Sequence, residues 1–255
     1  MYIIHSQGLL SLYQIDMDLR TIDFENFKKT PEDMVFSYEH EIPIIKGILL
    51  KHPEKLDFIG FNYCKSTPQS LRKNKSVHFF IYDYLFDRCW NRVADNTKLL
   101  QQFKFVMTPD FSEYTDMSIT FCMWQHFRKQ WLGAYWQLQG IPVIPTACWS
   151  TKESYKFCFE GMPKNACIAT SSQGWMCAEK AADKKNASID LSRGATKTAF
   201  REGTEVMMDE LTPKQLVWYG QVFNWVQDLC DQYDCQLIPV DADYKKRFAK
   251  FKEVE

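Results

Sequence analysis

The sequence predicts an α/β protein in which mainly parallel strands alternate with helices. Seven short apolar runs read as strands, and they are continuous, as expected for strands covered on both faces. Helical patterns separate most of these runs, which favours a parallel sheet with right-handed crossovers. We therefore expect a complete or partial β/α barrel of the TIM type. The alternative is an open doubly wound sheet.

The expected strands are short and evenly distributed along the chain. In chain order they cover residues 57–63, 77–84, 103–110, 141–149, 166–172, 215–220 and 236–241. Each is a run of six to nine mostly apolar residues, too short to be read as a helix of typical length. Seven strands, with an eighth from the N-terminal region, would suit either architecture.

Three helices are expected with defined bounds. The strongest covers residues 116–139, where large apolar side chains recur at steps of three and four: Met117, Phe121, Trp124, Trp131, Tyr135 and Leu138. Arg128 lies on the same stripe and is expected either to bind an anion or, as the favoured alternative, to form a buried pair with Asp110 or Glu113. Gly140 is placed to end this helix. The other two helices are expected at residues 196–211 and 222–233.

The whole chain, residues 1–255, is expected to be one domain. Residues 1–50 fit the alternating pattern poorly and are expected to be an N-terminal extension packed on it. Residues 178–195 are polar and read as a long loop. Residues 242–255 contain the basic run "YKKRFAKFKEVE" and are expected to form a helical tail.

Composition narrows the class of protein. A formal net charge of -1 gives no overall positive field, so net charge does not indicate nucleic-acid binding. No apolar run approaches the ~20 residues that span a bilayer, and the N-terminus lacks a secretory pattern. We expect a cytoplasmic protein with reduced thiols that does not bind membranes. The nine cysteines contain no C-x-x-C pair, which disfavours a cysteine metal site.

Polar and aromatic side chains follow nearly every expected strand. Since ligands bind at the carboxyl ends of parallel strands, we expect a ligand pocket there. Its predicted residues are Asp83, Asp110, Ser112, Thr146, Trp149, Ser171, Ser172, Tyr219 and Asp241.

The chemistry of this pocket stays open between several alternatives. Asp83 and Asp110 end consecutive strands and are a candidate site for a divalent cation, with Asp241 or Asp243 as a third ligand. The alternative is that Asp110 only caps the next helix. Ser171 and Ser172 could cradle a phosphate, or form an ordinary turn.

Aromatic residues that follow strand ends suggest stacking on a base or a sugar. These are Phe111, Trp149, Trp175 and Tyr219. The alternative is that they fill the core.

Several long motifs, in order, resemble one known family. They are "SVHFFIYDYLFDRCWN", "TPDFSEYTDMS", "FRKQWLGAYWQLQGIPVIPTACWS", "SYKFCFEGMPKNACIATSSQGW" and "LTPKQLVWYG", which together span about residues 56–226. The chain resembles an uncharacterised "domain of unknown function" family of phages and mobile elements of Gram-positive bacteria. The resemblance implies a phage or mobile-element origin and one α/β domain, but no reaction. It also implies an acidic residue where Tyr82 stands, which weakens a paired-carboxylate mechanism there.

Two functions follow from these observations. In the first, the protein is an enzyme that acts on a phosphate-bearing or nucleic-acid-related substrate in the strand-end pocket. In the second, it is a non-enzymatic phage protein that sequesters a small molecule or inhibits a host protein, such as a defence protein. The sequence does not decide between them.

Overall fold

The computed structural model describes residues 30–173 and 197–242. Seven strands are present in this part of the chain: β1 (Phe58–Gly60), β2 (Ser76–His78), β3 (Val106–Met107), β4 (Val143–Ile144), β5 (Cys167–Ser171), β6 (Gln215–Tyr219) and β7 (Gln236–Val240). Each lies within one predicted run or starts one residue before it, so the predicted strands are confirmed. Strands β1 to β4 are shorter than their apolar runs.

All strand pairs are parallel, and their order in space follows their order in the chain. One sheet has the order β1-β2-β3-β4 and the other β5-β6-β7. A parallel bridge between Thr146 and Ala169 connects the chain after β4 to β5. Sequential parallel order is the topology of a β/α barrel.

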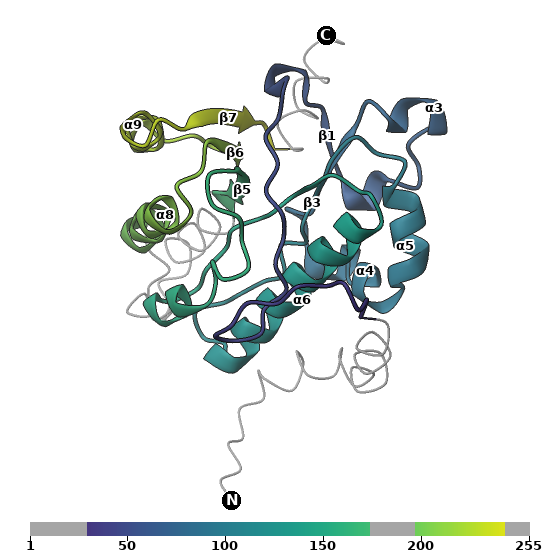
Figure 1. The fold of residues 1–255 in the computed structure, drawn as a ribbon. Helices are drawn as coiled ribbons and strands as arrows, with labels where there is room; N and C mark the ends of the chain where they lie inside the picture. The colour runs from purple at the N-terminus through teal and green to yellow at the C-terminus, as the bar shows by residue number, and fades with distance from the viewer. Residues whose placement is uncertain (1–29, 174–196, 243–255) are drawn as a thin grey trace, which may run out of the picture.

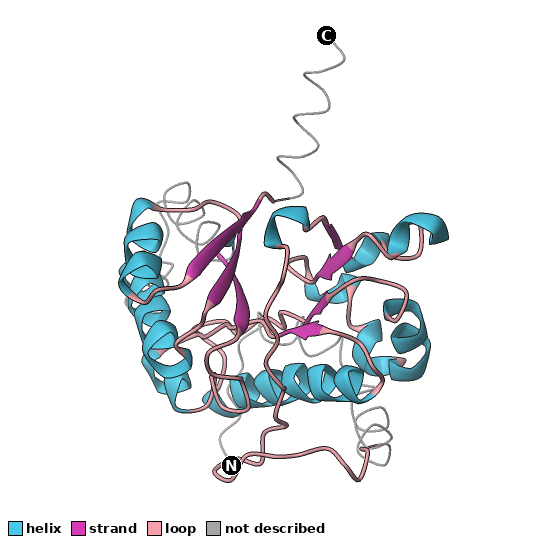
Figure 2. Cartoon of the chain, turned by 45° about the horizontal axis from the view of Figure 1, so that its top comes forward, coloured by secondary structure: helices cyan, strands magenta, loops and turns pink. Residues whose placement is uncertain are grey.

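The two sheets face one another across a shared interior. His78 of β2 lies against Tyr219 of β6 with ring centroids 4.5 Å apart, and Phe80 stacks on the same tyrosine at 4.9 Å. These strands belong to different sheets, so the strands must curl around the interior (Figure 2). No ladder joins β7 to β1 in the described part of the chain. The predicted α/β class with parallel strands and alternating helices is confirmed. The described residues form no closed barrel, and the arrangement fits a partial barrel or an open sheet.

Helices surround the strands (Figure 1). They are α3 (Gln69–Arg72), α4 (Arg88–Asn91), α5 (Val93–Leu100), α6 (Ile119–Leu138), α8 (Lys197–Leu211) and α9 (Asn224–Gln232), with 3-10 turns η1 (Pro53–Lys55), η2 (Phe61–Tyr63), η3 (Asp83–Leu85) and η4 (Lys152–Lys156). The three predicted helices are confirmed as α6, α8 and α9. Gly140, with φ +78°, follows the end of α6 in the left-handed conformation that favours glycine. No described helix is long and apolar enough to cross a bilayer.

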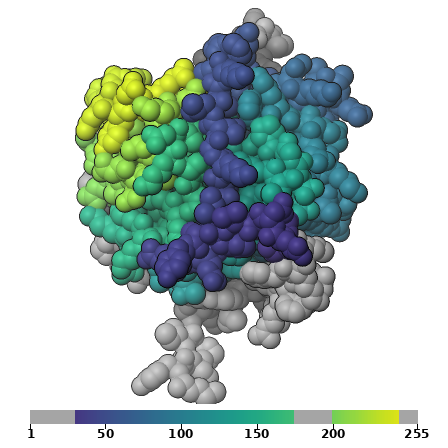
Figure 3. All heavy atoms as spheres, in the orientation of Figure 1, coloured from purple at the N-terminus to yellow at the C-terminus, as the bar shows by residue number. Residues whose placement is uncertain are grey.

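Residues 30–50 pack along the body of the molecule. Trp131 of α6 donates to the Thr30 hydroxyl at 2.9 Å, and the Gln137 side chain exchanges two hydrogen bonds with the Lys46 backbone, at 2.8 and 2.7 Å. Figure 3 shows this segment, in purple to blue, crossing the front of the molecule. The rest of the predicted extension, the loop at 178–195 and all of the predicted tail except Ala242 lie outside the described residues.

The aromatic residues fill two hydrophobic cores. One contains residues of all seven strands together with residues of helices α4 to α6, and the other lies under α8 and α9. In the second, Trp149 stacks on Phe200 of α8 with centroids 5.7 Å apart. Most described cysteines are buried in these cores as small apolar residues.

Candidate functional site

A network of buried and half-buried polar side chains lies where β2, β3 and β4 end and where α6 passes beneath them. We call it the carboxyl-end cluster. It comprises Asp83, Asp110, Ser112, Glu113, Gln125, Arg128, Lys129 and Cys148. Three of the predicted pocket residues, Asp83, Asp110 and Ser112, belong to it.

The segment after β3 forms one wall of this cluster. The chain leaves the sheet at Pro109 and stays non-helical until Ser118, whose hydroxyl accepts a hydrogen bond from the Phe121 N–H at 3.3 Å. Ser118 is therefore the N-cap of α6. The alternative that Asp110 caps this helix is wrong, and its carboxylate is left for other contacts.

Lys129 lies at the centre of the cluster. Its Nζ is 2.8 Å from the Cys148 Sγ and 3.8 Å from Glu113 Oε1, and the Cys148 thiol donates to the same carboxylate at 3.3 Å. Only 1% of the Lys129 side chain and 1% of the Glu113 side chain are exposed. Asp110 hydrogen-bonds Cys148 and feels the Lys129 charge. One ammonium, one thiol and two carboxyls thus share a desolvated space.

Burial shifts the acids of the cluster toward neutral pH. It raises the pKa of Asp110 to about 6 and that of Glu113 to about 7, against the opposing pull of Lys129. Burial alone would lower the pKa of Lys129, but Cys148, Glu113 and Asp110 outweigh it and raise the pKa. Burial also raises the pKa of the Cys148 thiol. Carboxyls that titrate near neutral pH beside a fixed cation suit general acid–base catalysis.

Asp83 is held in place by the loop after β3. It accepts hydrogen bonds from the Ser112 N–H at 3.0 Å and the Ser112 hydroxyl at 2.8 Å. Burial raises the pKa of Asp83, while Ser112 and Arg128 oppose the rise. Asp83 in turn raises the pKa of Asp110, so the two predicted carboxylates do act on each other.

The partner of Arg128 differs from the expectation. Its guanidinium donates to Gln125 and lies over the Phe111 ring, 4.1 Å from the centroid. The neighbouring Lys129 is the residue that pairs with Glu113. Neither Lys129 nor Cys148 is among the site residues predicted from the sequence. Their signal was weak, since a lysine in "FRKQW" also suits a solvated helix face.

Two predicted pocket residues beyond β4 have structural contacts. Thr146 exchanges two hydrogen bonds with Thr108, at 2.8 and 2.9 Å. Trp149 is only 3% exposed and packs against Phe159 and Phe200. A role for either residue in ligand binding stays a prediction.

The predicted residues of β5 to β7 lie on the other sheet. The Ser171 hydroxyl donates to the Tyr219 carbonyl at 3.2 Å and accepts from the Gln173 N–H at 3.1 Å. Ser172 is buried, and its hydroxyl has no hydrogen-bond partner among the described residues. Tyr219 faces the interior against His78, whereas Asp241 is exposed after β7. An anion or cation site here stays a prediction, and Trp175 lies outside the described residues.

A different set of side chains has the spacing of a metal site. In the described ranges, the ligand atoms of Glu39, His40 and Glu160 lie within 4.8 Å of one another. The Glu160 carboxylate already accepts from Ser37 and from the His40 N–H at 3.0 Å, and contacts His40 Nδ1 at 2.6 Å. These contacts tie residues 30–50 to the body without an ion. The Asp83 and Asp110 cation site stays a prediction.

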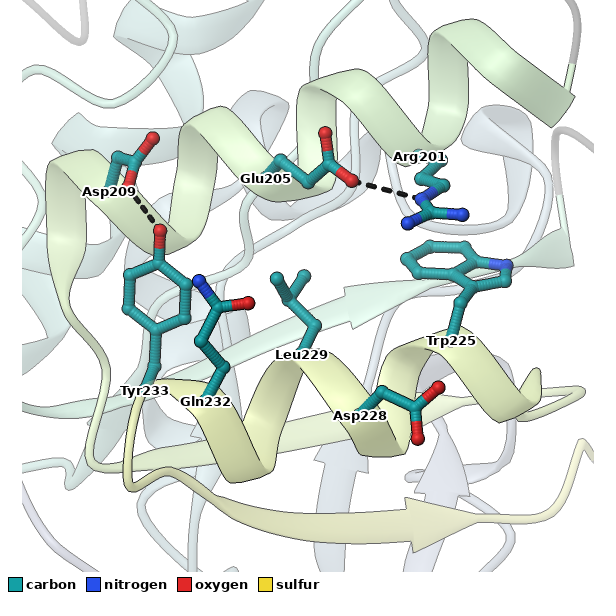
Figure 4. Close-up of a pocket in the computed structure, with 8 residues that line it drawn as sticks. All are labelled: Arg201, Glu205, Asp209, Trp225, Asp228, Leu229, Gln232 and Tyr233. Atoms are coloured by element: carbon teal, nitrogen blue, oxygen red, sulfur yellow. Dashed lines mark hydrogen bonds and ion pairs between the residues drawn. The ribbon is translucent and has the colours of Figure 1, made fainter.

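A hollow of about 430 Å³ lies between α8 and α9 (Figure 4). Its polar side chains bind one another: Arg201 pairs with Glu205 at 2.9 Å, and the Tyr233 hydroxyl donates to Asp209. Arg201 also lies over the Trp225 ring, 5.8 Å from its centroid. Few of its charged groups remain for a ligand.

Comparison with known proteins assigns the chain to a family. The model of one family, a domain of unknown function (DUF4417), matches residues 34–234, which contain most of the fold and of the site described above. The chain belongs to this family. The DUF4417 match contains every strand except the last, and the entire carboxyl-end cluster. The resemblance to a phage family of unknown function, inferred from the sequence motifs, is thereby confirmed.

This DUF4417 protein is similar to two phage proteins. The Gene 1 protein of Mycobacterium phage L5 is 32% identical over 175 residues, which cover 69% of this chain and 68% of that protein. The Gene 1 protein of Mycobacterium phage D29 is 35% identical over 147 residues, covering 58% and 49%. No solved structure matches the chain. The matches place it among phage-associated proteins.

Proposed function

We propose that this phage-associated protein is an enzyme whose ligand pocket lies at the carboxyl ends of β2, β3 and β4. In this proposal Asp110 and Glu113 transfer protons on a phosphate-bearing or nucleic-acid-related substrate. One observation carries it, namely the burial of the Lys129 and Glu113 side chains, each 1% exposed. A buried ion pair adds little to the stability of a fold, because the cost of desolvating its charges offsets their Coulomb attraction. Charges that are buried at so little gain in stability favour a chemical role.

Each member of the cluster has a role in this proposal. Lys129 is a fixed cation that would stabilise negative charge developing on a substrate oxygen. Glu113 keeps one oxygen, Oε2, without a hydrogen-bond partner among the described residues, so it can take or give a proton. Ser112 and Arg128 position Asp83, whose charge raises the pKa of Asp110. Asp83 and Asp110 could also hold a divalent cation through their oxygens.

A second function is favoured by an exposed aromatic pair. Tyr82 and Tyr84 flank Asp83, are 74% and 71% exposed, and stack with centroids 5.9 Å apart and an interplanar angle of 12°. Exposed tyrosines are enriched where proteins bind partners. This pair supports the alternative of a non-enzymatic protein that sequesters a small molecule or inhibits a host protein.

The test compares ligand binding and turnover in matched variants. Melting of the chain is followed with Mg²⁺, Mn²⁺, Zn²⁺ and a nucleotide panel, since a ligand of the native state raises the midpoint. Any phosphate release is then measured for Asp110→Asn, with Asp234→Asn, whose side chain is 95% exposed, as control. We expect Asp110→Asn to lose turnover without any fall in its melting temperature. No ligand shift and no turnover, together with capture of a host protein that Tyr82→Ala abolishes, would favour the second function.

A further inference from the structure

A second hollow lies away from the carboxyl-end cluster, beside α4 and α5. It has a volume of about 400 Å³ and is lined by Lys65, Arg88, Asn91, Arg92, Asp95 and Asn96. Three of these side chains are basic and one is acidic, although the whole chain has a net charge of -1. The hollow is therefore a local basic site, which the overall charge does not reveal.

Arg88 is the least satisfied of these basic residues. Its Nε and Nη2 atoms are buried and have no hydrogen-bond partner among the described residues. Its guanidinium is held over the Phe61 ring, 4.5 Å from the centroid. A buried donor without an acceptor costs free energy, and a charged one costs more. Stacking on the Phe61 ring fixes the plane of the Arg88 guanidinium. Its forked N–H groups match the geometry of an oxyanion bound through two oxygens.

The backbones that carry the three basic residues are fixed in place. The Asn96 side chain donates to the carbonyls of Arg88 and Arg92, each at 2.8 Å, across the break between α4 and α5. Arg72 donates to the Lys65 carbonyl at 3.1 Å and so holds the loop after η2. Preorganised groups lose less entropy when a ligand binds.

We propose that this hollow binds the phosphate group of a small phosphate-bearing molecule, with Arg88 and Arg92 as its main ligands and Lys65 at the edge. Its volume suits a molecule of nucleotide size better than a surface ion. Asp95 adds a negative charge that disfavours a second phosphate near it and can accept from a hydroxyl. This proposal does not depend on the acid–base chemistry proposed above.

The experiment is calorimetric titration of the full chain with inorganic phosphate, a nucleoside monophosphate and a short single-stranded oligonucleotide. The variants are Arg92→Gln, which changes an exposed residue, and Arg88→Lys, which keeps the charge but removes the fork. Arg201→Gln, an exposed arginine on α8, is the matched control. Circular dichroism confirms that each variant is folded.

We expect the nucleoside monophosphate to bind, and each hollow variant to weaken its binding at least about tenfold, since a charge-assisted hydrogen bond contributes roughly that much. Arg201→Gln should bind like the parent chain. Equal affinity in Arg92→Gln, Arg88→Lys and the parent would overturn the proposal. Binding of the oligonucleotide alone, lost at high salt, would overturn it in favour of a strand-binding surface. An absence of binding by every phosphate compound would also overturn it.

Discussion

Ser112 gives Asp83 two hydrogen bonds, from its backbone N–H at 3.0 Å and from its hydroxyl at 2.8 Å. Two loops that follow neighbouring strands, β2 and β3, are joined by this one contact. It stabilises the carboxylate form of a residue that burial pushes toward the neutral form. The proposed site therefore depends on a serine that need not touch a substrate.

Replacing Ser112 by alanine should destabilise the protein in a pH-dependent way. The variant loses one hydrogen bond to a charged group, which costs about 1.5 to 3 kcal/mol when Asp83 is ionised. The loss should become smaller as pH falls and Asp83 takes up its proton, because burial raises the pKa of this carboxyl. Urea unfolding at about pH 8 and at a series of lower pH values measures the difference. Ser171→Ala, which removes a hydroxyl bonded to the neutral Tyr219 carbonyl, should cost the same at all of these pH values.

The buried acids should make the folded state less stable as pH rises toward neutrality. The pKa of Asp110 is raised from 3.8 to about 6 and that of Glu113 from 4.5 to about 7. At a pH between the ordinary and the raised pKa of each group, the native state binds more protons at that group than the unfolded state does. Their contribution to stability is therefore present below about pH 4 and is lost as pH rises through about 7. The loss is on the order of 3 kcal/mol per group.

The measurement is the free energy of unfolding of Asp110→Asn plus Glu113→Gln across this range. Neither replacement titrates, so the curve should be flatter than that of the parent chain between about pH 4 and about pH 7. Parallel curves for the variant and the parent chain would mean that Asp110 and Glu113 have ordinary acidities.

The sequence predicted the strands well because burial on both faces leaves a simple pattern. β5, β6 and β7 coincide with the apolar runs 166–172, 215–220 and 236–241 almost residue for residue. In β2 and β3 the apolar runs continue past the last paired residue. After β2, for example, Phe79 and Phe80 pack into the core outside the ladder. An apolar side chain shows burial, but it does not show where hydrogen bonding ends.

The centre of the site could not be predicted for a related reason. Lys129 and Gln125 lie one turn apart on α6, opposite the apolar stripe, where polar residues usually meet water. In the folded chain residues 30–50 cover part of this helix, as the contact of Trp131 with Thr30 shows, and Lys129 faces the strand ends. The neighbouring Asp83 and Asp110 were predicted because strand ends are local in the sequence. The residues that pair with them come from tertiary contacts.

Replacing Lys129 alone should destabilise the protein more than replacing Lys129 and Glu113 together. In Lys129→Met the Glu113 carboxyl loses its cation 3.8 Å away, in a space from which water is excluded. Breaking a buried pair in this way costs about 3 to 5 kcal/mol where Glu113 is ionised, so the loss should grow as pH rises above about 7. Adding Glu113→Gln to Lys129→Met should recover part of that loss, because the uncompensated charge disappears.

Chemical denaturation of the single and double variants gives the coupling energy between the two positions. Lys214→Met is the control, since its partner Asp234 is 95% exposed and the pair lies at the surface. That variant should change stability by less than about 1 kcal/mol. Additive losses for Lys129 and Glu113 would show that the two side chains do not interact.

The close contact between Gly203 and Trp149 allows a test of whether the Trp149 indole belongs to the core or to a pocket. A Cβ at Gly203 of α8 would collide with the indole atoms Nε1, Cε2 and Cδ1 of Trp149. Gly203→Ala gains about 1 kcal/mol of helix propensity but forces the packed ring to move, so we expect a net loss of about 1 to 3 kcal/mol. In a Trp149→Leu background the ring is absent, and the same alanine should become neutral or stabilising.

Gly140→Ala is the control, because it lies in open space with φ +78° and its backbone strain should cost the same in both backgrounds. If Gly203→Ala is neutral in the parent chain, the indole is not packed on α8, and Trp149 regains its predicted place among the ligand-binding residues.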